Sequence, residues 1–164
     1  MEVWGDGRRT NLPPAEVVAR LNEIILDEME TEHYFTMLLA DVDLVTGHVI
    51  LAQAGHPHPV IQRADGSIEQ EGPGGLPVGL IPGAEFSQFC IDLNKGDRLF
   101  LLSDGVTECP DTGNGLLGEE GLEALMVDLA GHALEDTLPA MVWKLDEFSG
   151  GKGFTGDVAG ILRE

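Results

Sequence analysis

Residues 98–108 read Arg98-Leu-Phe-Leu-Leu-Ser-Asp-Gly-Val-Thr-Glu108. The first half is a near-continuous apolar run, which is typical of a central strand covered on both faces. The second half begins with Asp104-Gly105, a dipeptide that is common in turns. We therefore expect a buried strand that ends in a rigidly held carboxylate.

The segments on either side of this strand show helical periodicity. A helix is predicted from about Pro14 to Met29, because apolar residues recur there on one face, namely Val17, Val18, Leu21, Ile24 and Ile25. Two further helices are predicted after the strand from the same kind of apolar face. Their face residues are Leu122, Leu125, Met126 and Leu129 in one, and Leu138, Met141, Val142 and Leu145 in the other.

The remaining segments read as strands that are joined by tight turns. They are Tyr34–Asp43 with His48–Ala54, Val60–Arg63 with Ser67–Glu69, Phe89–Leu93, and a last strand at Val158–Leu162. Strands linked in hairpins and grouped between helices indicate an α+β fold, with antiparallel sheet under helices.

The composition is strongly acidic, with 29 Asp and Glu against 9 Lys and Arg and a formal net charge of −20. Such a surface repels the phosphates of nucleic acids and anionic membranes, so neither is expected as a partner. The acidic residues either keep the protein soluble or include carboxylates that gather around divalent cations. Composition alone favours the first explanation. Cys90 and Cys109 show no C-x-x-C pattern and suit reduced thiols in a cytoplasmic protein.

Three segments are candidates for chemistry. Asp104 follows the buried strand and has the oxygen ligands that Mg²⁺ and Mn²⁺ favour, while Gly105 allows close approach. Asp157 opens the last strand. For both carboxylates, a plain turn beside glycine remains the alternative. His56 and His58 lie in a proline-rich loop, where two histidines are too few for a tetrahedral zinc site, and His56 is interpreted as a residue that orders the loop.

Six segments in their order resemble the SpoIIE/RsbU-type phosphatases of the PPM class. They are Pro14–Asn22, Tyr34–Met37, Ala52-Gln-Ala-Gly-His-Pro57, Gly75-Leu-Pro-Val-Gly79, Gly96–Glu108 and Thr155-Gly-Asp-Val-Ala159. The resemblance runs from about Leu12 to Arg163. It divides the chain into an N-terminal remnant at 1–11 and a phosphatase-type domain portion at 12–164.

The resemblance implies an antiparallel β-sandwich flanked by helices. It also implies a two-metal site, with Mn²⁺ or Mg²⁺, that activates water to hydrolyse phosphoserine or phosphothreonine without a protein nucleophile. The implied substrates are regulators of the anti-anti-sigma type in bacterial signalling. Receiver or sensor domains often precede such phosphatases.

By the same resemblance, Asp104 corresponds to the metal-binding Asp of the Asp-Gly-Val motif and Gly105 to its neighbour. Gly55 and His56 correspond to an architectural loop near the site. Two features depart from the family pattern. The sequence lacks an Asp-x-x-Gly-His-Gly segment. Near the C-terminus the family commonly carries Asp-Asp-x-Thr with the first Asp as ligand, whereas this sequence has Gly156 at that position, then Asp157, and Ala159 in place of the threonine.

These departures predict a domain that lacks its N-terminal part and carries an incomplete metal site. Sheet edges and helix faces left uncovered would favour homodimers. An inactive, acidic pseudophosphatase that binds a signalling partner is therefore the alternative to an active enzyme.

Overall fold

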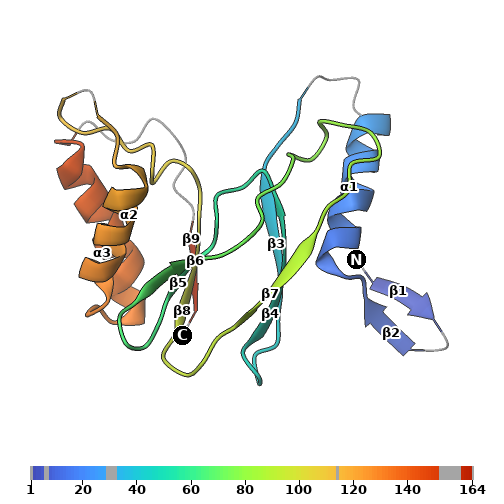
Figure 1. Ribbon diagram of the computed structural model, residues 1–164, viewed down its shortest axis with the longest axis horizontal. Helices are drawn as coiled ribbons and strands as arrows, with labels where there is room; N and C mark the ends of the chain where they lie inside the picture. Colours follow the sequence, from blue (N-terminus) through green and yellow to red (C-terminus); the bar gives the residue numbers. More distant parts are fainter. Residues whose placement is uncertain (1, 6–7, 29–32, 114, 152–159, 164) are drawn as a thin grey trace. The chain divides into compact units, whose positions relative to one another are not determined.

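The computed structural model describes residues 2–5, 8–28, 33–113, 115–151 and 160–163. The chain divides into two compact units (Figure 1). The first comprises Met1–His56 and Gly72–Asp92, and the second comprises Pro57–Glu71 and Leu93–Glu164. Each unit is therefore assembled from separate parts of the chain.

The first unit is built around a three-stranded antiparallel sheet in the order β3-β4-β7. Its strands are β3 (Met37–Val42), β4 (His48–Ala54) and β7 (Gln88–Asp92). The central strand, β4, is buried over most of its length. β3 begins at Met37 rather than at the predicted Tyr34, because Phe35 pairs instead with Val78 through two backbone hydrogen bonds.

Helix α1 (Pro14–Glu28) packs against this sheet, and its position confirms the predicted first helix. The fully buried Val18 lies among Ala52, Ala54 and Val78. Ile24 was expected on the buried face but is 41% exposed. At about 100° per residue, Ile24 lies roughly 120° around the helix from Val18, so it points away from the sheet.

The polar Asn22 takes a buried place on α1 instead. Its side-chain oxygen accepts a hydrogen bond from the backbone N–H of Gly79 at 2.8 Å, and its amide donates to the carbonyl of Ile81 at 3.0 Å. Both atoms of a buried amide are thus satisfied, which fixes the 79–81 loop against the helix.

Two strands near the N-terminus were not predicted. β1 (Glu2–Gly5) and β2 (Arg8–Asn11) form an antiparallel pair in which Gly5 lies opposite Arg8. The sequence between them is Asp6-Gly7, which is a strong hairpin signal.

The second unit contains a four-stranded antiparallel sheet in the order β6-β5-β8-β9. Its strands are β6 (Ile68–Gln70), β5 (Val60–Gln62), β8 (Arg98–Leu102) and β9 (Gly160–Arg163). β8 lies between two neighbours and is almost entirely buried, which confirms the prediction from its apolar run.

Helices α2 (Gly118–Leu129) and α3 (Leu134–Phe148) share a core with this sheet (Figure 1). All four predicted face residues of α2 are buried. On α3, Val142 was expected to be buried but is 46% exposed, because it lies about 100° around the helix from the buried Met141. Antiparallel sheets with helices packed on them confirm the α+β class.

The two cysteines are free, with Cys90 exposed and Cys109 buried. None of the helices in the described part of the chain has both the length and the apolarity needed to cross a bilayer.

Candidate active site

Asp104 lies one residue beyond the end of β8, after Ser103, in the turn that spans residues 104–108. The backbone N–H of Glu108 donates to the Asp104 carbonyl at 2.8 Å, and the Thr107 hydroxyl donates to the same oxygen at 3.1 Å. The side chain of Asp104 is exposed. The main chain of Asp104 is therefore fixed at the end of a buried strand while its carboxylate faces solvent.

Two side chains anchor this turn in the core of the unit. Val106 and Cys109 are almost fully buried and belong to the cluster that includes Phe100 and Met141. The Cys109 thiol lies 3.5 Å from the carbonyl of Leu145 in α3. Burial raises the pKa of Cys109, so this thiol remains protonated and acts as a packing residue.

Gly105 is buried between the exposed Asp104 and the anchoring Val106. It is not among the described glycines that have a positive φ. A left-handed backbone therefore does not account for glycine at this position.

A small hollow lies beside the Asp104 turn, within the second unit. It has a volume of about 10 Å³, enough for a single water molecule. Its polar lining includes His58, Ser103, Thr107 and Glu119, and the Gln70 amide donates to Glu119 at 2.9 Å. The surroundings of Asp104 thus offer hydroxyl, imidazole and carboxylate groups.

The Gly55–His56 loop belongs to the first unit and follows β4. Gln53, which is 2% exposed, donates to the His56 carbonyl at 2.7 Å and accepts from the Gly74 N–H at 2.9 Å. Gly55 has φ +68°, and a β-carbon there would come within 2.8 Å of Pro77. These contacts fix the loop through its backbone, and the role interpreted for the His56 side chain stays a prediction.

The metal ligands expected from the sequence are not brought together among the described residues. In that part of the chain, no group of three or more His, Cys, Asp and Glu is placed to hold a metal ion. Asp104 is one exposed carboxylate, whereas Asp157 and Gly156 lie outside the described residues. A complete two-metal centre does not fit these residues alone, and neither does a zinc site at His56 and His58.

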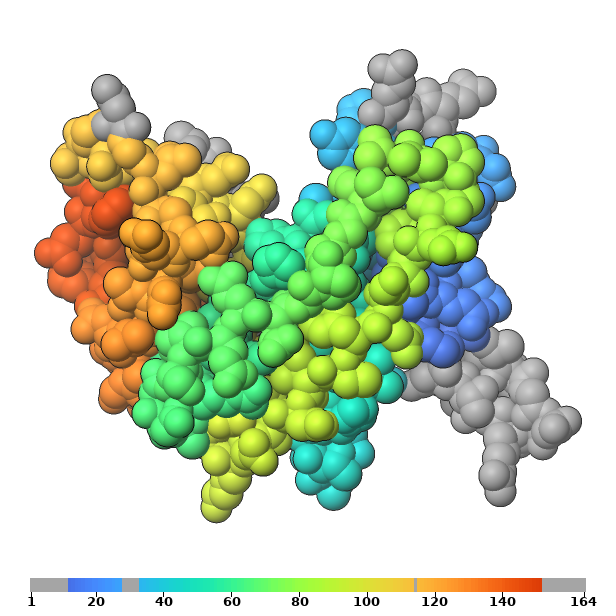
Figure 2. All heavy atoms as spheres, in the orientation of Figure 1, coloured from blue at the N-terminus to red at the C-terminus, as the bar shows by residue number. Residues whose placement is uncertain are grey.

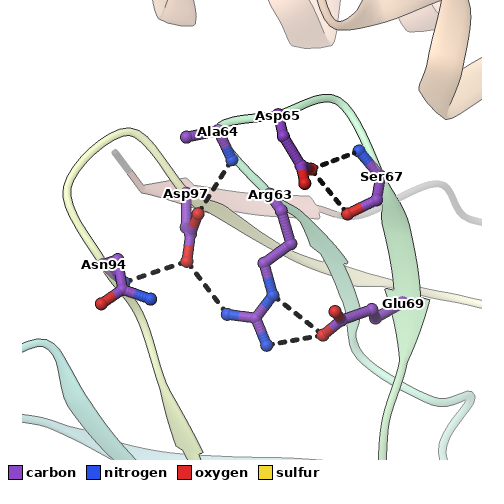
Figure 3. Close-up of polar contacts among 7 residues, drawn as sticks. All are labelled: Arg63, Ala64, Asp65, Ser67, Glu69, Asn94 and Asp97. Atoms are coloured by element: carbon purple, nitrogen blue, oxygen red, sulfur yellow. Dashed lines mark hydrogen bonds and ion pairs between the residues drawn. The ribbon is translucent and has the colours of Figure 1, made fainter.

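An ion-pair network that was not predicted from the sequence holds the start of β8 (Figure 3). Asp97 accepts three hydrogen bonds: from the Ala64 N–H at 2.9 Å, from the Asn94 N–H at 3.0 Å and from the Arg63 guanidinium at 2.9 Å. Arg63 also pairs with Glu69. No local pattern in the sequence connects Asp97 with its partner Arg63, because the two residues lie 34 positions apart.

The protonation of this network follows from its contacts. Burial opposes ionisation of Asp97, but the two backbone N–H groups and the Arg63 guanidinium outweigh it and keep the pKa of Asp97 below its ordinary value. The bond to Glu69 raises the pKa of Arg63 despite partial burial. Both groups are therefore charged at neutral pH.

The sequence matches a known protein family and a bacterial phosphatase. The family model described as Stage II sporulation protein E (SpoIIE) matches residues 6–162. The chain is 31% identical over 118 residues to phosphoserine phosphatase RsbU of Bacillus subtilis (strain 168), which is 71% of this chain and 35% of that relative.

Two solved structures resemble the chain at lower identity. The SiaA-PP2C domain of Pseudomonas aeruginosa has a TM-score of 0.79 at 16% identity, over 92% of this chain and 59% of that one. The phosphatase domain of SpoIIE from Bacillus subtilis (Mn presoaked) has a TM-score of 0.63 at 19% identity. The match covers 90% of this chain and 63% of that one. These likenesses show a shared PP2C-type fold. The chain spans about a third of RsbU and under two thirds of each solved chain.

Proposed function

The chain belongs to the SpoIIE family, and we propose that residues 12–164 form the later portion of a metal-dependent phosphatase domain that acts on phosphoserine or phosphothreonine. The observation that carries this proposal is the placement of Asp104. Its backbone is fixed at the end of the buried strand β8, and its carboxylate is exposed. A rigid carboxylate facing solvent suits a ligand of a hard cation.

The cation is Mn²⁺ or Mg²⁺, as the family resemblance implies. Asp104 contributes one oxygen ligand, and its neighbour Gly105 belongs to the same turn. Asp157 is the second candidate ligand. Further ligands have to come from residues outside the described part or from a segment with the Asp-x-x-Gly-His-Gly motif. The described residues therefore hold and orient Asp104 but do not by themselves complete the centre.

The substrate is a phosphorylated regulator of the anti-anti-sigma type in bacterial signalling. Support comes from the similarity to RsbU, which is named a phosphoserine phosphatase. A receiver or sensor domain upstream would control the activity in a longer protein.

Metal binding and hydrolysis test this proposal separately. The chain, alone and joined to a segment with the Asp-x-x-Gly-His-Gly motif, is titrated with Mn²⁺ by calorimetry and assayed with an aryl phosphate and a phosphoserine peptide. We expect Asp104→Asn to weaken Mn²⁺ binding at least tenfold and to remove hydrolysis, because a neutral amide is a poor ligand for a hard cation.

Glu108→Gln is the matched control, because Glu108 is an exposed carboxylate in the same turn and the substitution removes the same charge. It should leave both measurements unchanged. Equal Mn²⁺ binding by the Asp104 and Glu108 variants would exclude Asp104 as a ligand.

The alternative is a pseudophosphatase that binds a regulator without hydrolysing it. It is favoured by Gly156 at the family's ligand position and by the lack of a ligand cluster among the described residues. If the chain is a pseudophosphatase, neither the chain alone nor the chain joined to the added segment should bind Mn²⁺ or hydrolyse the aryl phosphate. Both should still bind the phosphoserine peptide.

A further inference from the structure

Helix α3 is exposed along one of its faces. Seven exposed residues between Glu135 and Glu147 fall within an arc of about 140° around the helix, at about 100° per residue. The buried Met141 and Leu145 lie on the opposite side and belong to the core of the second unit. Figure 2 shows side chains of α3, in orange to red, at the surface. We refer to the seven exposed residues as the outer face of α3.

Three residues of the outer face are apolar and lie together around a tryptophan. Trp143 is 62% exposed, and its neighbour Val142 is 46% exposed. Pro139 is also exposed and lies one helical turn before Trp143. Tryptophan is enriched among the residues that carry most of the binding energy at protein interfaces. An exposed indole ring on a helix is therefore a suitable anchor for a partner.

The other four residues of the outer face are carboxylates, namely Glu135, Asp136, Asp146 and Glu147. Among the described residues, none of the four forms an ion pair. Lys144 is the only basic residue of α3, and it lies outside the arc and pairs with Asp128 of α2. The outer face thus combines an aromatic ring with four carboxylates and carries no basic residue.

The acidic residues of α2 are arranged differently. Asp128 is paired with Lys144, and Glu119 accepts a hydrogen bond from the Gln70 amide. The helix contains no aromatic residue. Of the two helices, α3 is therefore the one that presents carboxylates without ion-pair partners beside an aromatic ring.

We propose that the outer face of α3 is a docking site for an arginine-containing basic segment of a partner protein. A guanidinium group stacks on an indole ring and pairs with carboxylates through its fork of N–H donors, so arginine suits both parts of the face. Charge complementarity selects this partner over a second copy of the chain, since each copy carries a net charge of −20. From Glu135 to Glu147 the face is about 18 Å long, which about six residues of an extended segment would span.

The emission of Trp143 tests whether the partner binds at this face. The chain has two tryptophans, so Trp4→Phe leaves Trp143 as the only one. The probe is a peptide of about ten residues in which arginine alternates with serine, added at physiological salt. We expect a saturable change in Trp143 emission, with weaker binding in about 0.5 M NaCl because salt screens the exposed charges. An emission that does not change would overturn the proposal.

Variants of the whole chain are compared by the anisotropy of the same peptide with a fluorescein label. Trp143→Ala should weaken binding about fivefold or more, because it removes the ring on which the guanidinium stacks. Asp146→Asn with Glu147→Gln removes two carboxylates beside that ring and should weaken binding about fivefold. The matched control is Glu120→Gln with Glu123→Gln, which removes the same charge from exposed positions of α2 and should leave binding unchanged. Equal weakening by the two double variants would mean general charge attraction and would overturn the proposal.

Peptide controls and sedimentation complete the test. The peptide with lysine in place of arginine should bind about threefold more weakly, and the peptide with glutamate should not bind. Equal affinity of the arginine and lysine peptides would refute stacking on Trp143 and the choice of an arginine-containing partner. A dimer that forms without peptide and dissociates with Trp143→Ala would mean that the face holds a second copy, which also refutes the proposal. If circular dichroism shows that Trp143→Ala does not fold, the two double variants decide the outcome.

Discussion

Asp97 directly precedes β8, and Asp104 follows it after Ser103. The hydrogen bonds of Asp97 therefore help to determine where Asp104 lies. Asp97 joins the turn at Ala64 to the turn at Asn94 directly before the strand. Arg63 holds the same carboxylate and reaches Glu69 in β6. The start of β8 is thereby fixed, so the position of Asp104 at its end depends on polar contacts as well as on the buried turn.

Asp97→Asn should destabilise the chain by about 2–3 kcal/mol, because the amide cannot accept the three hydrogen bonds and leaves Arg63 without one charged partner. Urea unfolding at pH 7 measures this difference. The folded pKa of Asp97 lies below its unfolded value of about 3.9, so its contribution is complete above that value and disappears as the pH falls through the folded pKa. The two proteins should therefore converge in stability at low pH.

Glu123→Gln is the control for the loss of one negative charge, because Glu123 is exposed on α2 in the same unit. It should unfold within about 0.5 kcal/mol of the unchanged chain. A similar loss in both variants at pH 7 would mean that net charge, and not the network at Asp97, controls the stability.

Among the elements, the loop after β4 depends on a glycine for two reasons. Gly55 has φ +68°, a conformation that costs other residues about 1–2 kcal/mol, and a β-carbon there would lie 2.8 Å from Pro77. Gly66, in the β5–β6 turn, has φ +89° with no atom within 4 Å of its β-carbon position. Comparing substitutions at Gly55 and Gly66 therefore separates the cost of backbone strain from the cost of the steric clash with Pro77.

Gly55→Ala should reduce the free energy of unfolding by about 2–4 kcal/mol, whereas Gly66→Ala should reduce it by about 1–2 kcal/mol, since only the first adds a clash to the strain. Both values come from urea unfolding followed by circular dichroism. Equal losses would show that Pro77 moves aside and that the 72–79 loop does not require Gly55.

Apolar periodicity predicts the buried faces of helices and strands well, but not their margins. The buried strand β8 and the four-residue face of α2 were predicted correctly, because an apolar run and a 3.6-residue repeat report burial directly. Ile24 and Val142 were assigned to buried faces and are exposed, because each lies at the margin of its apolar stripe, where the packing partner decides. The β1–β2 pair was missed although Asp6-Gly7 is a hairpin signal, because flanking strands of four residues show little alternation.

For the whole molecule, the site was less predictable than the fold. Asp104 was found because its strand and its turn are both local features of the sequence. The contacts of Asp97 with Arg63 and of Gln53 with Gly74 join residues far apart in the chain, so no local pattern reveals them. The family resemblance supplied the role of Asp104, and that role remains a prediction because the described residues bring no second ligand to it.

The net charge of −20 leads to a prediction for the chain as a whole. At 0.01 M ionic strength the Debye length is about 30 Å, so carboxylates across each unit repel one another, whereas at 0.15 M it is about 8 Å. Raising NaCl between these values at pH 7 should increase Tm by roughly 2–4 °C, the shift that about 1 kcal/mol produces in a chain of this size. Near the isoelectric point of about 4.3 the same change should have little effect, because the net repulsion is gone. A fall in Tm with salt at pH 7 would instead mean that pairs such as Arg63 with Asp97 outweigh the repulsion among the acidic residues.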